Sequence, residues 1–159
     1  MNEIIIKRAV IFALILGAFI GLLSSIPSLI GFSILVLSFF TSLIVIFYMK
    51  RNEKYLGIIT NQQGAILGGI IGFFSGVGFF ITFCPMVCIL HLIFKSYYSY
   101  GIPDILHDAF WLFIVIVIMV GAIFGMINSA TGMATAWFLD KIEKKPENSD
   151  APLDIKIED

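Results

Sequence analysis

Three long stretches without any charged side chain divide the chain. They run from Ala9 to Met49, from Tyr55 to Phe94 and from Ala109 to Leu139. A helix needs about 20 mostly apolar residues to cross the hydrocarbon core of a bilayer. The first stretch has 41 residues, enough for two such crossings. The second has 40 residues but includes a polar run at 60–63, so it is assigned one crossing, as is the third, which has 31. The pattern therefore predicts four transmembrane helices.

Proline and polar residues mark the ends of these helices. Pro27 lies between serines, where a turn is favoured, and so divides the first stretch into two helices. The polar run at 60–63 suits an approach to the membrane, and Pro85 should kink or end the third helix. We therefore predict transmembrane helices at roughly residues 5–25, 28–49, 64–94 and 109–139.

The four helices are expected to form one all-α membrane domain, an up-down bundle over residues 1–139. A polar, tyrosine-rich loop at 95–108 joins the last two helices. The remaining residues, 140–159, are charged and lack an apolar period, so we predict that they form a disordered tail.

The composition agrees with a membrane protein. Hydrophobic residues make up 59% of the chain and charged residues 13%, and the mean hydropathy is +1.01. Soluble domains have about a quarter charged residues. Too few charges remain here to cover a surface that faces water, which excludes an ordinary soluble domain. The net charge of −1 gives no sign of a nucleic-acid partner, and the lipid bilayer is the expected surrounding.

The basic residues are divided unevenly between the two sides of the predicted bundle. Lys and Arg accumulate on the cytoplasmic side of membrane proteins. Every Lys and Arg except Lys95 falls on the side of the chain termini. This pattern predicts that both termini lie in the cytoplasm. The residues on that side are Lys7, Arg8, Lys50, Arg51, Lys54, Lys141, Lys144, Lys145 and Lys156.

Small residues recur at a spacing of four in three of the predicted helices. Such a spacing lets two helix backbones approach closely within a membrane, as in a glycine zipper. The glycine faces fit two interpretations: packing within the chain, or contact with another copy or another membrane protein. The glycines concerned are Gly17, Gly21, Gly64, Gly68, Gly72, Gly76, Gly121 and Gly125.

The two cysteines and one histidine form the most distinctive group of potential ligands. Cys84, Cys88 and His91 are spaced at i, i+4 and i+7, which places them on one helical face. Thiolates and an imidazole suit Zn or Cu(I). A free cysteine in such a helix also behaves as a small apolar residue. Metal binding and plain packing therefore both remain open from the sequence.

Two further polar groups have an ordinary and a functional interpretation. One combines helix-four residues with the polar run at 60–63, and fits either hydrogen bonds between helices or a small polar vestibule. The other lies in the loop before helix four, where a solvated loop is favoured over a hydrolytic site. The first group is Asn128, Ser129, Thr131 and Thr135, and the second is Asp104, His107 and Asp108.

Catalytic motifs are missing from the sequence. It contains no Ser-His-Asp arrangement, zinc-protease motif or phosphate-binding glycine loop. Apart from Lys7 and Arg8 at the start of the first, the predicted spans also contain no Asp, Glu, Lys or Arg, the residues that usually mark ion and proton paths. We therefore predict that the chain is not an enzyme and holds no cofactor.

The region that joins the second and third helices resembles a known type of protein. It reads FYMKRNEKYLGIIT over residues 47–60, followed by Gly64 and Ala65. This is similar to a family of small, four-helix bacterial inner-membrane proteins of unknown function, which carry a basic-aromatic loop, a glycine and a helix that opens in Gly or Ala. The resemblance implies a bacterial plasma membrane and supports the predicted topology, but it implies no activity.

The sequence leads to three hypotheses about function. The first is an assembly or accessory protein that acts through glycine-faced helix contacts. The second is a small transporter or channel subunit. The third is a metal-handling membrane protein that uses Cys84, Cys88 and His91.

Overall fold

The computed structural model describes residues 3–53, 59–94 and 101–143, and this part of the chain is helical with no strands. Three helices are long and apolar enough to cross a membrane, and a fourth span is formed if a bent pair of helices is counted as one. The helices are α1 (Glu3–Ser24), η1 (Pro27–Leu29), α2 (Ile30–Phe39), α3 (Thr41–Glu53), α4 (Asn61–Ile93), α5 (Ile102–Asp108) and α6 (Phe110–Glu143).

The helix α4 begins three residues before the predicted start. The backbone N–H of Gln63 donates to the Thr60 hydroxyl at 3.3 Å, and the N–H of Thr60 donates to the Gln63 side-chain oxygen at 3.2 Å. This capping box satisfies backbone donors that would otherwise lack a partner, so the helix can start at Asn61. The helix also continues through Pro85 to Ile93, so the third span does not end early there.

The second span is not the single helix predicted over 28–49. It consists of the short helix η1, then α2, then α3, and the axis bends by 56° at the break after Phe39. No proline or glycine lies at the break. The prediction was wrong because backbone groups at this point are bonded by a side chain of α6, which hydropathy does not reveal.

The segment before the last span contains a short helix that was predicted as loop. Gly101 has a φ of 68°, a left-handed conformation that glycine adopts without strain, and α5 starts directly after it. Residues 95–100 of the predicted tyrosine-rich loop lie outside the described residues. The last span, α6, continues to Glu143 rather than ending at 139, and residues 144–159 of the predicted tail lie outside the described part.

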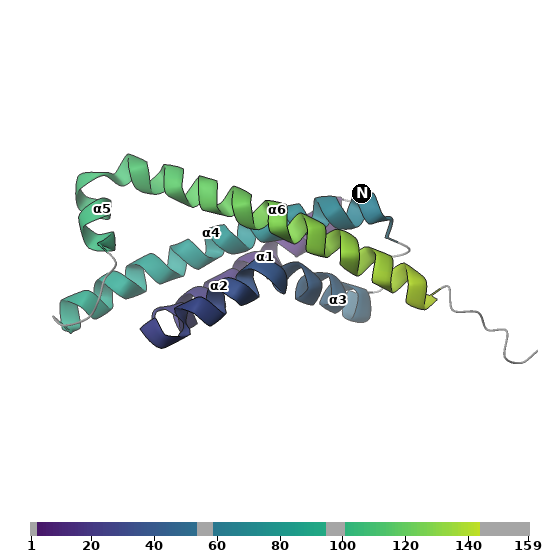
Figure 1. Cartoon of the computed structure of the whole chain (residues 1–159), viewed down its shortest axis with the longest axis horizontal. Helices are drawn as coiled ribbons and strands as arrows, with labels where there is room; N and C mark the ends of the chain where they lie inside the picture. The colour runs from purple at the N-terminus through teal and green to yellow at the C-terminus, as the bar shows by residue number, and fades with distance from the viewer. Residues whose placement is uncertain (1–2, 54–58, 95–100, 144–159) are drawn as a thin grey trace, which may run out of the picture.

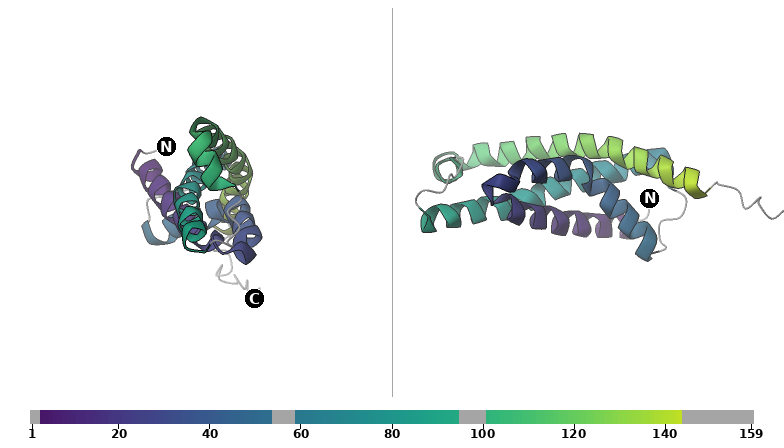
Figure 2. Two further views of the ribbon diagram at one scale, coloured as in Figure 1. Left: turned by 90° about the vertical axis from the view of Figure 1, so that its left-hand side faces the viewer. Right: turned by 60° about the horizontal axis from the view of Figure 1, so that its bottom comes forward.

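The helix α4 lies between α1 and α6 along much of its length (Figure 1, Figure 2). The pair α2–α3 lies beside these three helices. The start of α1 and the end of α6 lie at one end of the bundle, and α5 lies at the other. Both α4, with 33 residues, and α6, with 34, are about 50 Å long at 1.5 Å per residue. They exceed the hydrocarbon thickness of a bilayer, which tilt or protruding turns accommodate.

Glycines lie where α4 touches its two neighbours. A Cβ added at Gly17 of α1 would overlap the carbonyl group of Ser75 in α4. On the other side of α4, a Cβ at Gly68 would overlap the carbonyl oxygen of Asn128 in α6. The backbones are thus in direct contact, and any larger residue would force the helices apart. An added Cβ would also overlap the neighbouring helix at three more glycines of the predicted faces, Gly21, Gly64 and Gly72. The contacts between α4 and α6 are looser at Gly76, Gly121 and Gly125.

Candidate functional site

The break between α2 and α3 is held by the side chain of Asn128. Its amide nitrogen donates to the carbonyl oxygen of Leu37 and to that of Phe124 in its own helix, each at 3.0 Å. Its carbonyl oxygen accepts from the backbone N–H of Ser42 at 3.0 Å. Asn128 is completely buried. One side-chain amide therefore binds both a carbonyl and an N–H of the break in the second span.

Hydroxyl groups around Asn128 complete this polar cluster. The Thr41 hydroxyl donates to the Leu37 carbonyl at 3.0 Å. The hydroxyls of Ser42 and Thr131 are hydrogen-bonded to each other at 2.5 Å and so join α3 to α6. Unbonded backbone groups cost several kcal/mol in a bilayer, where no water replaces the lost partner. By bonding these backbone groups, the cluster stabilises a sharp bend within an apolar span.

The polar residues predicted in the last span have separate roles. Asn128 and Thr131 make hydrogen bonds to the second span, as one of the two interpretations expected. The Thr135 hydroxyl instead donates to the Thr131 carbonyl of its own helix at 2.7 Å. Asn61 lies beside Ala130 and Trp137 in a shallow apolar pocket. Sequence reasoning missed Thr41 and Ser42, although adjacent hydroxyl residues in an apolar span are known to bend helices.

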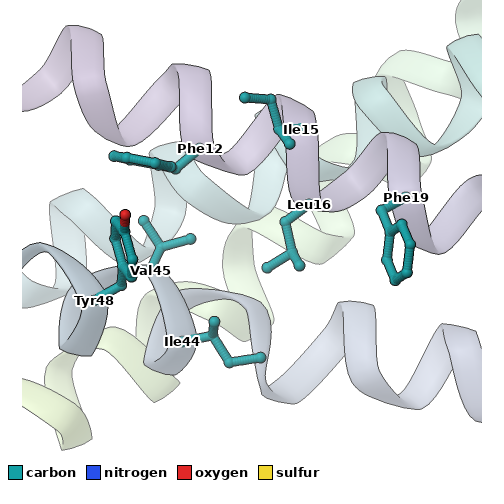
Figure 3. A pocket seen from close by; sticks show the side chains of 7 residues that line it. All are labelled: Phe12, Ile15, Leu16, Phe19, Ile44, Val45 and Tyr48. Atoms are coloured by element: carbon teal, nitrogen blue, oxygen red, sulfur yellow. The ribbon is translucent and has the colours of Figure 1, made fainter.

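Two apolar grooves flank α3, one on each side. The first, which we call the α1/α3 groove, has a volume of about 330 Å³. Figure 3 shows Phe12 next to Tyr48 at one end of this groove and Phe19 at the other. The rings of Phe12 and Tyr48 meet edge to face, with centroids 4.9 Å apart. The groove is lined by Phe12, Ile15, Leu16, Phe19, Ile44, Val45 and Tyr48.

The second groove, which we call the α3/α6 groove, has a volume of about 580 Å³. Both volumes fall in the range of small-molecule sites, about 300–1,000 Å³. Among the described residues that line this groove, Thr131, Thr135 and Trp137 carry a polar group in the side chain. The groove is lined by Phe39, Leu43, Phe47, Thr131, Ala134, Thr135, Trp137 and Phe138.

The predicted metal ligands lie along an uninterrupted part of α4. Cys84 is buried with Phe79, Phe83 and Val87, while Cys88 is partly exposed. Cys84 and His91 are seven positions apart in the sequence, a rise of about 10 Å along the helix. Among the residues that the structure describes, no three His, Cys, Asp or Glu side chains form a group that could hold a metal ion. Metal binding by this group stays a prediction.

The acidic and histidine residues before α6 are exposed. Nδ1 of His107 lies 2.5 Å from an oxygen of Asp108, and these side chains are 89% and 74% exposed. A pair so open to solvent is held weakly, since water screens its attraction. Asp104 lies in the first turn of α5 and is also exposed. The arrangement is that of a solvated surface.

The glycine faces predicted from the sequence were incomplete. Gly132 of α6 lies against Gly64 and Gly68 of α4, and Gly78 of α4 lies against Leu14 of α1. A signal for Gly132 was its spacing of seven from Gly125, two helical turns further along the same face.

Comparison of the chain with protein-family models, with curated proteins and with solved structures found no match.

Proposed function

We propose that this chain is a multi-pass accessory protein of a bacterial plasma membrane that holds a transmembrane helix of another membrane protein in its α1/α3 groove. In this proposal the bent pair η1–α2 and α3 forms one of four spans, and both termini lie in the cytoplasm. The uneven distribution of basic residues supports this orientation. The resemblance of residues 47–60 to small inner-membrane proteins supports the location.

The observation that carries the proposal is the shape of the α1/α3 groove. Helices associate in membranes through packing of side chains, because lipid is as apolar as the helices themselves. A groove offers a partner more contacts than a convex helix surface. Phe19 and Ile15 are 59% and 61% exposed at its rim, and Tyr48 is 46% exposed. These large side chains are available to interdigitate with those of an incoming helix.

The position of the glycines favours the α1/α3 groove, rather than the glycine faces, as the surface that binds a partner. The glycines of α1 and α4 lie against neighbouring helices of the same chain. They build a rigid centre from α1, α4 and α6, so a partner meets other surfaces. The assembly role is therefore assigned to the groove and not to the glycine faces.

Photo-cross-linking in native membranes tests the proposal. A photoreactive residue at Phe19 or Ile44 in the groove should give an adduct of defined mass with a second membrane protein. The matched controls are Ile118 and Met126, which are exposed on α6 away from the groove. An adduct of twice the chain mass would identify the partner as another copy. Adducts with lipid alone, or the same protein adduct at all four positions, would contradict the proposal.

The broken span favours a second candidate, a small transporter subunit. Transporters often bind substrate where a helix is interrupted within the membrane, beside exposed helix ends. Here the interruption lies at the cluster of Ser42, Asn128 and Thr131. Liposomes that contain the protein should then take up ions or small polar solutes faster than empty liposomes, and Asn128→Leu should change the rate. Equal rates with and without the protein, for every solute tested, would exclude this candidate.

A further inference from the structure

The α3/α6 groove continues into a crevice that carries positive charge. The crevice has a volume of about 220 Å³ and shares Phe47 with the groove. Besides Phe47 it is lined by Lys50, Arg51, Leu139 and Ile142, so the last turns of α3 and α6 form its walls. We call this the basic crevice. The groove and the crevice adjoin at Phe47, and we call the two together the channel, which has basic side chains at one end.

Two of the described residues that line the basic crevice, Lys50 and Arg51, carry positive charge. Lys50 is partly buried and Arg51 is exposed, and the lining side chains that the structure describes include no acidic one. A third cation lies close by, because Nζ of Lys141 is 5.0 Å from the centre of the Trp137 ring, which lines the adjoining groove. The end of the channel therefore attracts an anion, while its length accepts only apolar groups.

We propose that this channel binds one anionic phospholipid. One of its acyl chains lies in the α3/α6 groove, and its phosphate meets Lys50 and Arg51 in the basic crevice. Arginine binds phosphate oxygens with paired N–H groups, and lysine adds a point charge. A phospholipid supplies both the apolar chain and the anion in one molecule. A partner helix would need an acidic residue at this one depth to do the same.

The inference rests on the proposed orientation, in which the ends of α3 and α6 lie at a membrane surface. It does not rest on the proposed partner helix, because the α1/α3 groove lies on the other side of α3. Two basic side chains near a membrane surface should favour an anionic lipid over a zwitterionic one by about 30-fold.

Fluorescence quenching of Trp137 tests the proposal directly. The chain has two tryptophans, so Trp111→Phe leaves Trp137, in the wall of the α3/α6 groove, as the only one. The protein is reconstituted in phosphatidylcholine vesicles with a small fraction of phosphatidylglycerol, and bromine is placed on the acyl chains of one lipid at a time. Brominated phosphatidylglycerol should quench Trp137 far more than its share of the bilayer predicts.

Variants separate a site from general surface charge. Lys50→Gln with Arg51→Gln should remove the excess quenching, and Lys50→Arg with Arg51→Lys should keep it. The matched control is Lys7→Gln with Arg8→Gln, which removes the same charge from another Lys-Arg pair at the same end of the bundle. The control should keep the excess. The proposal would be overturned if the control lost the excess quenching as well. It would also be overturned if the variant with Lys50→Gln and Arg51→Gln kept the excess quenching.

A variant that fills the groove keeps the test valid if the charge variant does not fold. Ala134 is exposed in the wall of the α3/α6 groove, and Ala134→Leu should lower the excess quenching while leaving the basic residues in place. Equal quenching by brominated phosphatidylcholine would show that any lipid fills the groove, which also contradicts an anionic site. Chemical labelling from the two sides of the membrane reports separately on the orientation. A failure of the proposed lipid site can therefore be distinguished from a failure of the proposed orientation.

Discussion

Asn128 shows how a single residue can shape a membrane-spanning helix. Its amide is bonded on both sides, to the carbonyl of Leu37 and to the N–H of Ser42. In water, solvent would take over these bonds at small cost. In a bilayer the same groups have no other partner, so the identity of this one side chain decides whether the bend is stable.

The role of Asn128 can be measured by replacing it with leucine. Asn128→Leu leaves the Ser42 N–H without a partner and removes one donor from the Leu37 carbonyl, so it should lower the free energy of unfolding by about 2 kcal/mol. The control is Thr135→Val, which removes a hydroxyl bonded only within α6 and should cost much less. Thermal unfolding in detergent micelles compares the two variants. Equal losses would show that Asn128 does not support the break.

The glycines offer a second test at the scale of the residue. Gly68→Ala places a methyl group against the carbonyl oxygen of Asn128, and such overpacking typically costs 1–3 kcal/mol. Gly31→Ala is the control, because nothing lies within 4 Å of the added methyl group there. Alanine is the better helix former, so the control should be neutral or slightly stabilising. If both variants unfolded at the same temperature, the close approach of α4 and α6 would be unimportant for stability.

At the scale of the element, the second span differs from the others in being bent. The helices α1, α4 and α6 run without interruption, although α4 contains Pro85. The second span breaks where it has neither proline nor glycine. The positions of proline and glycine in the sequence therefore do not predict which of these helices is interrupted. The bend separates α2 and α3 in direction and leaves grooves on both sides of α3.

An isolated second span should be straighter than the same span in the protein. A peptide of residues 27–53 in detergent micelles lacks Asn128 and Thr131, so its backbone groups near Thr41 can bond only within the peptide. We expect one continuous helix from about Ile30 onward. Residual dipolar couplings measured by NMR report the angle between its two halves. A bend near 56° in the peptide would show that Thr41 and Ser42 suffice to break the helix.

At the scale of the whole molecule, the basic ends of the helices lie together. The start of α1 with Lys7, the end of α3 with Lys50 and the end of α6 with Lys141 lie at the end of the bundle opposite α5 (Figure 1). This arrangement would present several positive charges to one membrane surface. It also brings the basic crevice to the same end of the bundle as the start of α1 and the end of α6.

The orientation predicts a pattern of chemical labelling in intact cells. In a chain with Cys84→Ser and Cys88→Ser, a cysteine at Asp104 should react with a maleimide that cannot cross membranes. A cysteine at Gln62, exposed in the first turn of α4, should react only after the cells are opened. The physical reason is the attraction of basic segments to the cytoplasmic side. The reverse pattern would invert the proposed topology, and reaction of both sites in intact cells would exclude it.

The sequence by itself determined that the chain is helical and apolar enough for a membrane. It also located α1, α4 and α6 to within a few residues, because hydropathy and length are properties of each segment alone. The four-residue spacing of Gly64, Gly68 and Gly72 placed these glycines on one face, since helical periodicity is fixed by the backbone. The capping box of Thr60 and Gln63 was also readable locally, although it was interpreted as an approach to the membrane.

Only the tertiary structure decided where the second span breaks and what each glycine touches. Asn128 lies 86 residues from Ser42 along the chain, so no local pattern connects them. Gly17 and Gly68 have similar surroundings in sequence, yet one faces Ser75 and the other faces Asn128. The grooves beside α3 exist because the bend and the packing of three other helices occur together. Their shape is a property of the assembled bundle, and periodicity within any one helix does not contain it.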